Sequence, residues 1–258
     1  MSYALVTGAS KGIGKSIAEQ LAEKGNDLIL VARSENLLKD LSRSLQQKYS
    51  VKVDYLALDL ALPNAADEIY RWCVSKDYSI HILVNNAGYG LWGKFEDLDL
   101  SKQEEMLQVN IRTLIKLTHA FIPVLKQQKK AYILNVASTA AYQAVPTLSL
   151  YAASKSFVLL FTRGIRLELK NSSVSVSCLC PGPTSTNFVD RAGMSDSIKK
   201  KADAFGMTPE DVAKIGLKGM FSGKAEIVPG LLNKITVWFT AIVPKSIPEN
   251  IAVNLYKN

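Results

Sequence analysis

Cysteine and histidine are scarce in this chain of 258 residues, which contains three of the first and two of the second. The cysteines Cys73, Cys178 and Cys180 form no Cys-x-x-Cys pair, so a zinc site is not expected and no metal ion is predicted. Cys178 and Cys180 alternate within an apolar run and are expected to be core residues. This cysteine usage fits a reducing, cytoplasmic location.

Long apolar runs are also missing. The longest one near the C-terminus, Ile235 to Val243, is too short to cross a bilayer, so no membrane span is predicted. The chain enters a strand-like run at Tyr3, and we expect no signal peptide before it.

Positive charge exceeds negative charge only moderately, with a net charge of +8. The lysine runs at residues 129–130 and 199–201 are most simply explained as solvated faces. No basic stripe with interleaved aromatic residues occurs, so a nucleic-acid partner is not expected. Part of the positive charge could instead serve a polyanionic cofactor.

The composition that remains is globular, with 48% apolar and 21% charged residues, and the length suits one large domain. Short apolar runs alternate with helical patterns, including a long helix expected at residues 101–128. The expected strands lie at residues 3–6, 28–31, 51–58, 80–84, 131–136, 174–180 and 225–228. Such alternation predicts the α/β class: a Rossmann-like, doubly wound parallel sheet with helices on both faces, in a single domain over residues 1–258.

Two segments near the end of the chain depart from this alternation. Residues 184–207 are expected to form an insertion that acts as a substrate lid, where Phe188, Met194, Phe205 and Met207 could face a substrate. Residues 231–258 are expected to form a C-terminal helical extension.

A glycine-rich turn follows the first strand and reads Thr-Gly-Ala-Ser-Lys-Gly-Ile-Gly over residues 7–14. Strand, glycine turn and helix is the context of a dinucleotide-phosphate site. Gly8 would permit the tight turn, Gly12 the approach of a pyrophosphate, and Gly14 close packing of helix on strand. The alternative is an ordinary tight turn.

Arg33 ends the second strand, where an NAD-binding protein would place an acidic residue for the ribose. A guanidinium at this point suits a 2′-phosphate, and Lys11 in the glycine turn could supply a second cation. The alternative is that Arg33 forms a surface salt bridge. The position and the charge together favour NADP over NAD.

Polar groups also follow the third and fourth strands. Asp59-Leu60 ends one, and residues 85–88 (Asn-Asn-Ala-Gly) end the other, at the edge where parallel sheets bind ligands. The apolar residues Tyr89, Leu91, Trp92 and Phe95 could then form a substrate wall. Asn110, among apolar neighbours in the long helix, is either a satisfied core amide or a functional one.

Tyr151 and Lys155 lie four residues apart, which puts them on one face of a helix. A phenol has a pKa of about 10, and a nearby cation favours its ionised form, so the pair could exchange a proton near neutral pH. Ser138 follows a strand and could bring a hydroxyl to the same point. Taken alone, the Tyr-x-x-x-Lys spacing is also that of an ordinary helix face.

All these motifs in this order resemble the short-chain dehydrogenase/reductase family over about residues 2–230. The resemblance implies the strand order 3-2-1-4-5-6-7 and a catalytic set in which Tyr151 is the general acid, Lys155 lowers its pKa, Ser138 holds the substrate oxygen and Asn110 holds a relay water. It also implies that Asp59 and Asn86 contact the adenosine and that Thr184 and Thr186 contact the nicotinamide amide or a phosphate. The implied cofactor-binding residues are Gly8, Ser10, Lys11, Gly12, Ile13, Gly14, Arg33, Asp59, Leu60, Asn86, Ala87, Gly88, Tyr151, Lys155, Pro181, Gly182, Thr184 and Thr186.

The expected activity is reduction of a ketone or aldehyde by NADPH, reversible with NADP+, on a small carbonyl or alcohol substrate. One alternative is a reductase of 3-oxoacyl thioesters or long-chain acyl ketones, suggested by the apolar pairs Leu91-Trp92 and Trp238-Phe239. Another is a protein that senses NADP(H) without turnover. The resemblance implies a homodimer through the helices that begin near residues 101 and 150. A tetramer is the alternative, although residues 228–234 lack the Gly-Gly strand with which many 3-oxoacyl reductases build one.

Overall fold

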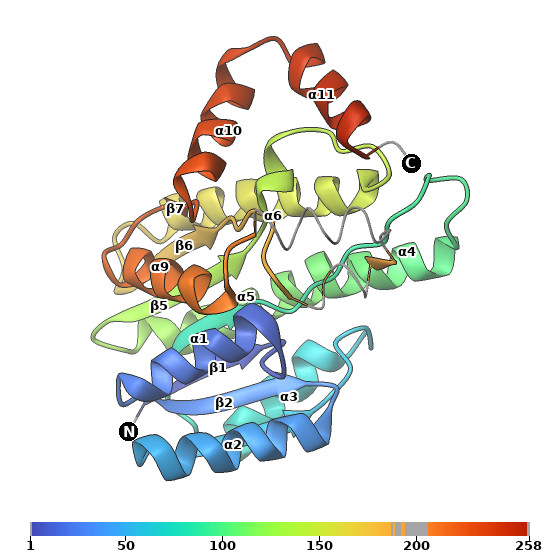
Figure 1. The fold of residues 1–258 in the computed structure, drawn as a ribbon. Helices are drawn as coiled ribbons and strands as arrows, with labels where there is room; N and C mark the ends of the chain where they lie inside the picture. Colours follow the sequence, from blue (N-terminus) through green and yellow to red (C-terminus); the bar gives the residue numbers. More distant parts are fainter. Residues whose placement is uncertain (1, 187, 189–191, 194–205, 257–258) are drawn as a thin grey trace.

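A seven-stranded parallel sheet forms the centre of the computed structural model, which describes residues 2–186, 188, 192–193 and 206–256 (Figure 1). The strand order is β3-β2-β1-β4-β5-β6-β7, so the predicted fold class and strand order are confirmed. The strands are β1 (Tyr3–Thr7), β2 (Asp27–Ala32), β3 (Val53–Ala57), β4 (Ile80–Asn85), β5 (Ala131–Val136), β6 (Val174–Leu179) and β7 (Glu226–Ile227).

The two faces of the sheet are buried under different helices because successive side chains of a strand point to opposite sides. In β1, Leu5 belongs to the core under α3 (Ala65–Ser75), α5 (Leu114–Lys126) and α6 (Ser149–Glu168). Its neighbours Ala4 and Val6 belong to the core under three helices on the other face. Those helices are α1 (Gly12–Glu23), α2 (Glu35–Tyr49) and α9 (Pro209–Phe221).

The point where the strand order reverses lies at β1, which pairs with β2 on one side and with β4 on the other. Chain connections leave this point in opposite directions, which opens a crevice at the carboxyl ends of the strands. The glycine turn after β1 and the Asn-Asn-Ala-Gly turn after β4 therefore meet there, as the sequence suggests.

The long helix expected at residues 101–128 is present over residues 100–126, but a π-helical turn divides it into three segments. These are α4 (Leu100–Leu107), a π-helical turn called η1 (Gln108–Thr113) and α5. A π-helical turn inserts an extra residue into the helix and often marks a functional site. Asn110 lies within it.

Two helices end the described chain, α10 (Leu231–Ile242) and α11 (Ser246–Tyr256). Both lie within the helical extension expected at residues 231–258, but the sequence pattern predicted only the first as a separate helix. Figure 1 shows them at the top of the molecule, standing away from the sheet. Among the described residues, no helix combines the length and apolar character needed to cross a membrane. Most of the expected lid, including Met194 and Phe205, lies outside the described residues.

Candidate functional site

One cavity of about 1080 Å³ lies at the carboxyl ends of the strands. It runs from the glycine turn and Arg33 at one end, the nucleotide end, to Ser138, Tyr151 and Lys155 at the other, the catalytic end. All eighteen residues predicted to bind the cofactor line it. Of the four predicted catalytic residues, only Asn110 does not.

The glycine turn leaves no room for side chains. Gly8 has a φ of +66°, and a Cβ there would lie 2.8 Å from Asn86 Nδ2. A Cβ on Gly14 would lie 2.3 Å from the same nitrogen and 2.3 Å from the carbonyl oxygen of Gly8. Helix α1 begins here with no side-chain cap on its backbone N–H groups. An uncapped helix N-terminus beside a cavity is a site for a phosphate group.

Asn86 holds this turn against the end of β4, a task that the sequence did not suggest. Its Nδ2 donates to the carbonyl oxygens of Thr7 (2.9 Å) and Gly8 (3.3 Å). The Thr7 hydroxyl in turn accepts from the backbone N–H groups of Asn86 (3.0 Å) and Ala87 (3.1 Å). Both amide hydrogens of Asn86 are thus used inside the protein, and its predicted contact with adenosine stays untested.

The position of Arg33 allows both a surface salt bridge and a contact with a 2′-phosphate, and the structure is compatible with both. Its Nη1 lies 3.8 Å from Asp59 Oδ2 in an ion pair whose side chains are 50% and 43% exposed, so a surface salt bridge is present. The same guanidinium lines the cavity beside Lys11. An exposed pair at this distance contributes little to stability. A phosphate could therefore replace the carboxylate as the partner of Arg33 at small cost.

Lys155 lies at the opposite end and is almost fully buried, with 4% of its surface exposed. Its Nζ donates to the carbonyl oxygen of Val136 (2.9 Å) and lies 5.8 Å from the centre of the Tyr151 ring. Burial lowers the pKa of Lys155 from 10.5 to about 8, and Cys178 and Cys180 oppose this shift weakly. The ammonium is therefore still mostly protonated at neutral pH.

Ser138 begins a short 3-10 turn, Thr139–Tyr142, directly after β5. Its Oγ accepts a hydrogen bond from the backbone N–H of Ala140 (3.1 Å). This bond uses a lone pair and leaves the hydroxyl hydrogen able to donate. Ser138, Tyr151 and Lys155 all line the same cavity, and the catalytic roles expected for them stay predictions.

Asn110 lies behind Gly88, a residue of the cavity wall, and there is no room for a side chain at that glycine. A Cβ on Gly88 would lie 2.9 Å from Asn110 Oδ1 and 3.1 Å from Lys155 Nζ. The Asn110 amide accepts from the backbone N–H of Tyr89 (3.1 Å) and donates to Tyr89 O (2.9 Å) and Ser154 Oγ (3.1 Å). It is a satisfied buried amide that lies close to Lys155.

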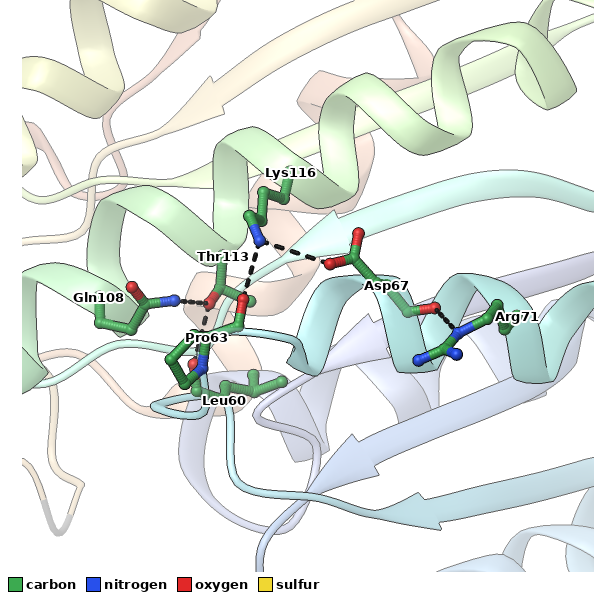
Figure 2. Close-up of polar contacts among 7 residues, drawn as sticks. All are labelled: Leu60, Pro63, Asp67, Arg71, Gln108, Thr113 and Lys116. Atoms are coloured by element: carbon green, nitrogen blue, oxygen red, sulfur yellow. Dashed lines mark hydrogen bonds and ion pairs between the residues drawn. The ribbon is translucent and has the colours of Figure 1, made fainter.

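The π-helical turn that carries Asn110 is tied to the nucleotide end of the cavity (Figure 2). The Thr113 hydroxyl donates to the carbonyl oxygen of Leu60 (2.8 Å) and accepts from Gln108 Nε2 (3.3 Å). Lys116 Nζ donates to the carbonyl oxygen of Pro63 (2.8 Å) in the same loop. Leu60 lines the nucleotide end of the cavity. The hydrogen bonds of Thr113 and Asn110 therefore connect the loop at that end of the cavity with helix α6, which carries Tyr151 and Lys155.

The predicted apolar wall at Tyr89, Leu91, Trp92 and Phe95 is wrong, because none of these residues lines the cavity. The Tyr89 hydroxyl points to α4 and donates to Glu105 Oε1 (2.8 Å), while Phe95 is exposed. The pair Trp238-Phe239 does not line the cavity either.

The observed apolar wall comes from segments whose role the sequence did not reveal. Between residues 142 and 148, Val145 and Leu148 line the cavity beside Tyr142 and Gln143, and Thr236, Val237 and Thr240 come from α10. Phe188, which was predicted to face a substrate, lines the cavity with its ring centre 5.3 Å from that of Tyr151. Thr236 and Thr240, four residues apart among apolar neighbours, are a signal that could have marked α10.

Comparison with known proteins shows the family and agrees with the fold. Residues 2–197 match the family model described as short chain dehydrogenase. A 7beta-hydroxysteroid dehydrogenase of Clostridium sardiniense is 32% identical over 232 residues, which cover 90% of this chain and 87% of that protein. A very-long-chain 3-oxoacyl-CoA reductase of Anas platyrhynchos is 31% identical over 264 residues, covering 99% of this chain and 80% of that protein. A short-chain dehydrogenase from Sphingobium yanoikuyae, solved in complex with NADPH, aligns with a TM-score of 0.83 and 28% identity over 95% of this chain and 98% of that one.

Proposed function

The chain belongs to the short-chain dehydrogenase family of oxidoreductases, and within it we propose an NADPH-dependent enzyme that reduces a ketone or aldehyde to an alcohol, reversibly. The observation that carries the proposal is the pairing of Tyr151 with a buried Lys155 beside Ser138, in a cavity that also contains a phosphate-binding turn. A bound nicotinamide would supply the hydride.

The protein's own residues would supply the proton and hold the developing charge. The Tyr151 phenol would give its proton to the carbonyl oxygen of the substrate. Lys155 would stabilise the phenolate that remains, since its ammonium lies over the same ring and is held by Val136. Ser138 would donate its hydroxyl hydrogen to the substrate oxygen while negative charge develops there. Asn110 would keep the backbone around Tyr89 and the environment of Lys155 in place, as part of the proton relay.

NADPH is proposed over NADH because two cations, Arg33 and Lys11, line the nucleotide end. The acidic side chain that lines it, Asp59, is already paired with Arg33 and is therefore not free to bind the two ribose hydroxyls of NADH. A 2′-phosphate would meet the guanidinium in charge-assisted hydrogen bonds.

A long-chain acyl ketone or 3-oxoacyl thioester is the second candidate substrate. The apolar side chains Val145, Leu148, Phe188 and Val237, which line the cavity, favour a bulky apolar substrate. A related reductase acts on very-long-chain 3-oxoacyl-CoA, according to its name. Turnover that does not increase along a series of lengthening acyl chains would remove this candidate.

The test is NADPH oxidation against a broad carbonyl panel with wild-type protein, Tyr151→Phe and Tyr142→Phe. Tyr151→Phe should lower turnover by about 10²–10⁴-fold, the usual contribution of a general acid. Tyr142 is the matched control, because its phenol also lines the cavity but donates to Glu226 Oε1 (2.5 Å). Equal turnover in wild type and Tyr151→Phe would reject the mechanism, and tight NADPH binding without turnover on any substrate would favour a sensor.

A further inference from the structure

Helix α10 has two faces of opposite character. Its inner face meets the body of the protein: Asn233 packs on Gly182, where a Cβ would lie 2.3 Å from Asn233 Oδ1, and Thr236 and Thr240 line the cavity. Its outer face carries Leu231, Ile235, Trp238 and Ile242, all exposed. The spacing i, i+4, i+7, i+11 puts these four side chains in one stripe along the helix.

The stripe continues beyond α10. Leu232 flanks it, and Ile247 and Ile251 extend the exposed apolar surface onto α11. These residues define the outer face: Leu231, Leu232, Ile235, Trp238, Ile242, Ile247 and Ile251. Of the sixteen exposed large apolar side chains in the described part of the chain, seven belong to this face. Because α10 and α11 project from the rest of the molecule in Figure 1, a flat partner can reach them.

Charge selects the kind of partner. Lys234 lies near the start of α10, and Lys245 follows its end, where its Nζ donates to the carbonyl oxygen of Thr240 (2.9 Å). From residue 227 to residue 248 the chain has no acidic residue, and Glu249 in the first turn of α11 is the one carboxylate among the residues of this face. A second copy of the same face would bring four lysines together with two carboxylates, and the excess of positive charge disfavours self-association. An anionic lipid surface would attract both lysines.

The length of α10 determines how this helix could be oriented at a lipid surface. The twelve residues of α10 span about 18 Å, well short of the roughly 30 Å of a bilayer core. The helix can therefore lie only in the plane of the interface, with its apolar stripe among the acyl chains and its lysines at the headgroups. Trp238, in the middle of the stripe, is a side chain that favours this interface.

We propose that the outer face of α10 and α11 binds the surface of an anionic lipid bilayer. The inner face of α10 lines the cavity, so binding would hold the cavity within about one helix diameter, about 10 Å, of the lipid. This proposal concerns a partner surface and does not depend on the reaction proposed above.

The experiment is vesicle flotation of the full chain with phosphatidylcholine alone and with phosphatidylcholine mixed with phosphatidylglycerol. Wild-type protein should float with the anionic vesicles and bind the neutral ones more weakly. Ile235→Glu and Trp238→Glu should each lower the partition coefficient about tenfold or more, because each removes a buried apolar side chain and adds a repelled charge. Lys234→Gln should lower it about fivefold on anionic vesicles only.

Val74→Glu is the matched control, since Val74 is an equally exposed apolar residue on α3, away from α10 (60% exposed). It should bind as wild type does. Circular dichroism and NADPH affinity of every variant in the absence of lipid check that each is folded. Absence of flotation, equal binding to neutral and anionic vesicles, or equal loss in Ile235→Glu and Val74→Glu would overturn the proposal. So would a wild-type dimer that becomes a monomer in Ile235→Glu while neither protein binds lipid, because a second copy would then cover the face.

Discussion

The two ends of the cavity each present a cation, yet the two cations differ in almost every physical respect. Lys155 is buried, hydrogen-bonded to Val136 and close to Tyr151, whereas Arg33 is half exposed and forms a long ion pair with Asp59. Burial makes a charge costly, sensitive to pH and insensitive to salt. Exposure makes a charge inexpensive and easily screened. The buried end is therefore suited to chemistry, and the exposed end to selecting a cofactor.

Removal of the buried cation should have the largest effect. Lys155→Met keeps the length of the side chain and removes its charge, so the phenolate of Tyr151 would lose its stabilising partner. Turnover should fall by about 10²–10⁴-fold, the range for a disabled acid-base group. Single-turnover kinetics at saturating NADPH measures this loss apart from cofactor binding. Unchanged turnover would show that Lys155 has no part in catalysis.

The same substitution should make the protein more stable at neutral pH. Lowering the pKa of Lys155 from 10.5 to about 8 costs roughly 3 kcal/mol of folding free energy. The variant avoids this cost but leaves the carbonyl of Val136 without its donor, worth about 1–3 kcal/mol. A net gain of about 0–2 kcal/mol in the free energy of unfolding is expected at pH 7, measured by urea denaturation.

The pH dependence of that gain fixes its cause. Below pH 8 the lysine is protonated in both the folded and the unfolded wild type, and the cost is present in full. Between about pH 8 and 10.5 the unfolded state binds a proton that the folded state does not, so wild-type stability rises relative to the variant. The advantage of Lys155→Met should therefore disappear by about pH 10. A gain that is constant with pH would have another origin.

Reversal of the exposed cation should have a smaller effect, confined to cofactor choice. Wild-type protein should prefer NADPH to NADH by about 10- to 100-fold, because exposed charge-assisted bonds contribute less than their full 1.5–3 kcal/mol. Arg33→Asp should abolish this preference, since the new carboxylate repels the 2′-phosphate and can accept from ribose hydroxyls. The dissociation constants of both cofactors on both proteins measure it.

The control for Arg33→Asp is Arg43→Asp, which changes the net charge equally at an exposed site on α2 outside the cavity. It should leave the preference almost unchanged. Equal wild-type affinity for the two cofactors, or an Arg33→Asp protein that still prefers NADPH, would contradict the role of Arg33.

The link between the two ends can be tested at Thr113. Thr113→Val keeps the volume but leaves Leu60 O and Gln108 Nε2 without a partner, which should cost about 1–3 kcal/mol of stability. The Michaelis constant for NADPH should rise with it, because Leu60 lines the cavity. Thr113→Ser, which keeps the hydroxyl and loses a methyl group, should be the less damaging change in both measurements. The reverse order would mean that packing, and not the hydrogen bond, holds the π-helical turn.

The sequence was informative wherever function depends on a local turn or on the end of a strand. Gly8 and Arg33 follow their strands directly, and parallel strands bring these ends to one edge of the sheet whatever the details of packing. The strand at residues 131–136 was predicted with its observed bounds, because a strand buried on both faces is a mostly apolar run, broken here only by the buried Asn135.

Long-range contacts account for what the sequence could not reveal. The π-helical turn at Asn110 depends on hydrogen bonds to Tyr89, Ser154 and Leu60, none of them near in the chain. The wall formed by α10 depends on Asn233 meeting Gly182 about fifty residues away. The apolar residues Leu91 and Trp92 suggested a substrate wall, but they pack against the protein core and do not line the cavity. Apolar character predicts that a side chain is buried, and it does not predict whether a substrate or the protein itself covers that side chain.

Salt should separate the two ends most simply, although its effect is the smallest. Raising the salt concentration from 0.1 M to 1 M shortens the Debye length from about 10 Å to about 3 Å. The proposed preference for NADPH over NADH would rest on the half-exposed Arg33 and should fall about threefold to tenfold. Turnover at saturating NADPH rests on the buried Lys155, which solvent ions cannot approach, and should change by less than about twofold. Potassium chloride titrations of both quantities on the same preparation supply the measurement. If turnover fell with salt as steeply as cofactor preference, Lys155 would be reachable by solvent in the working enzyme, and the contrast between a buried catalytic cation and an exposed selecting cation would be lost.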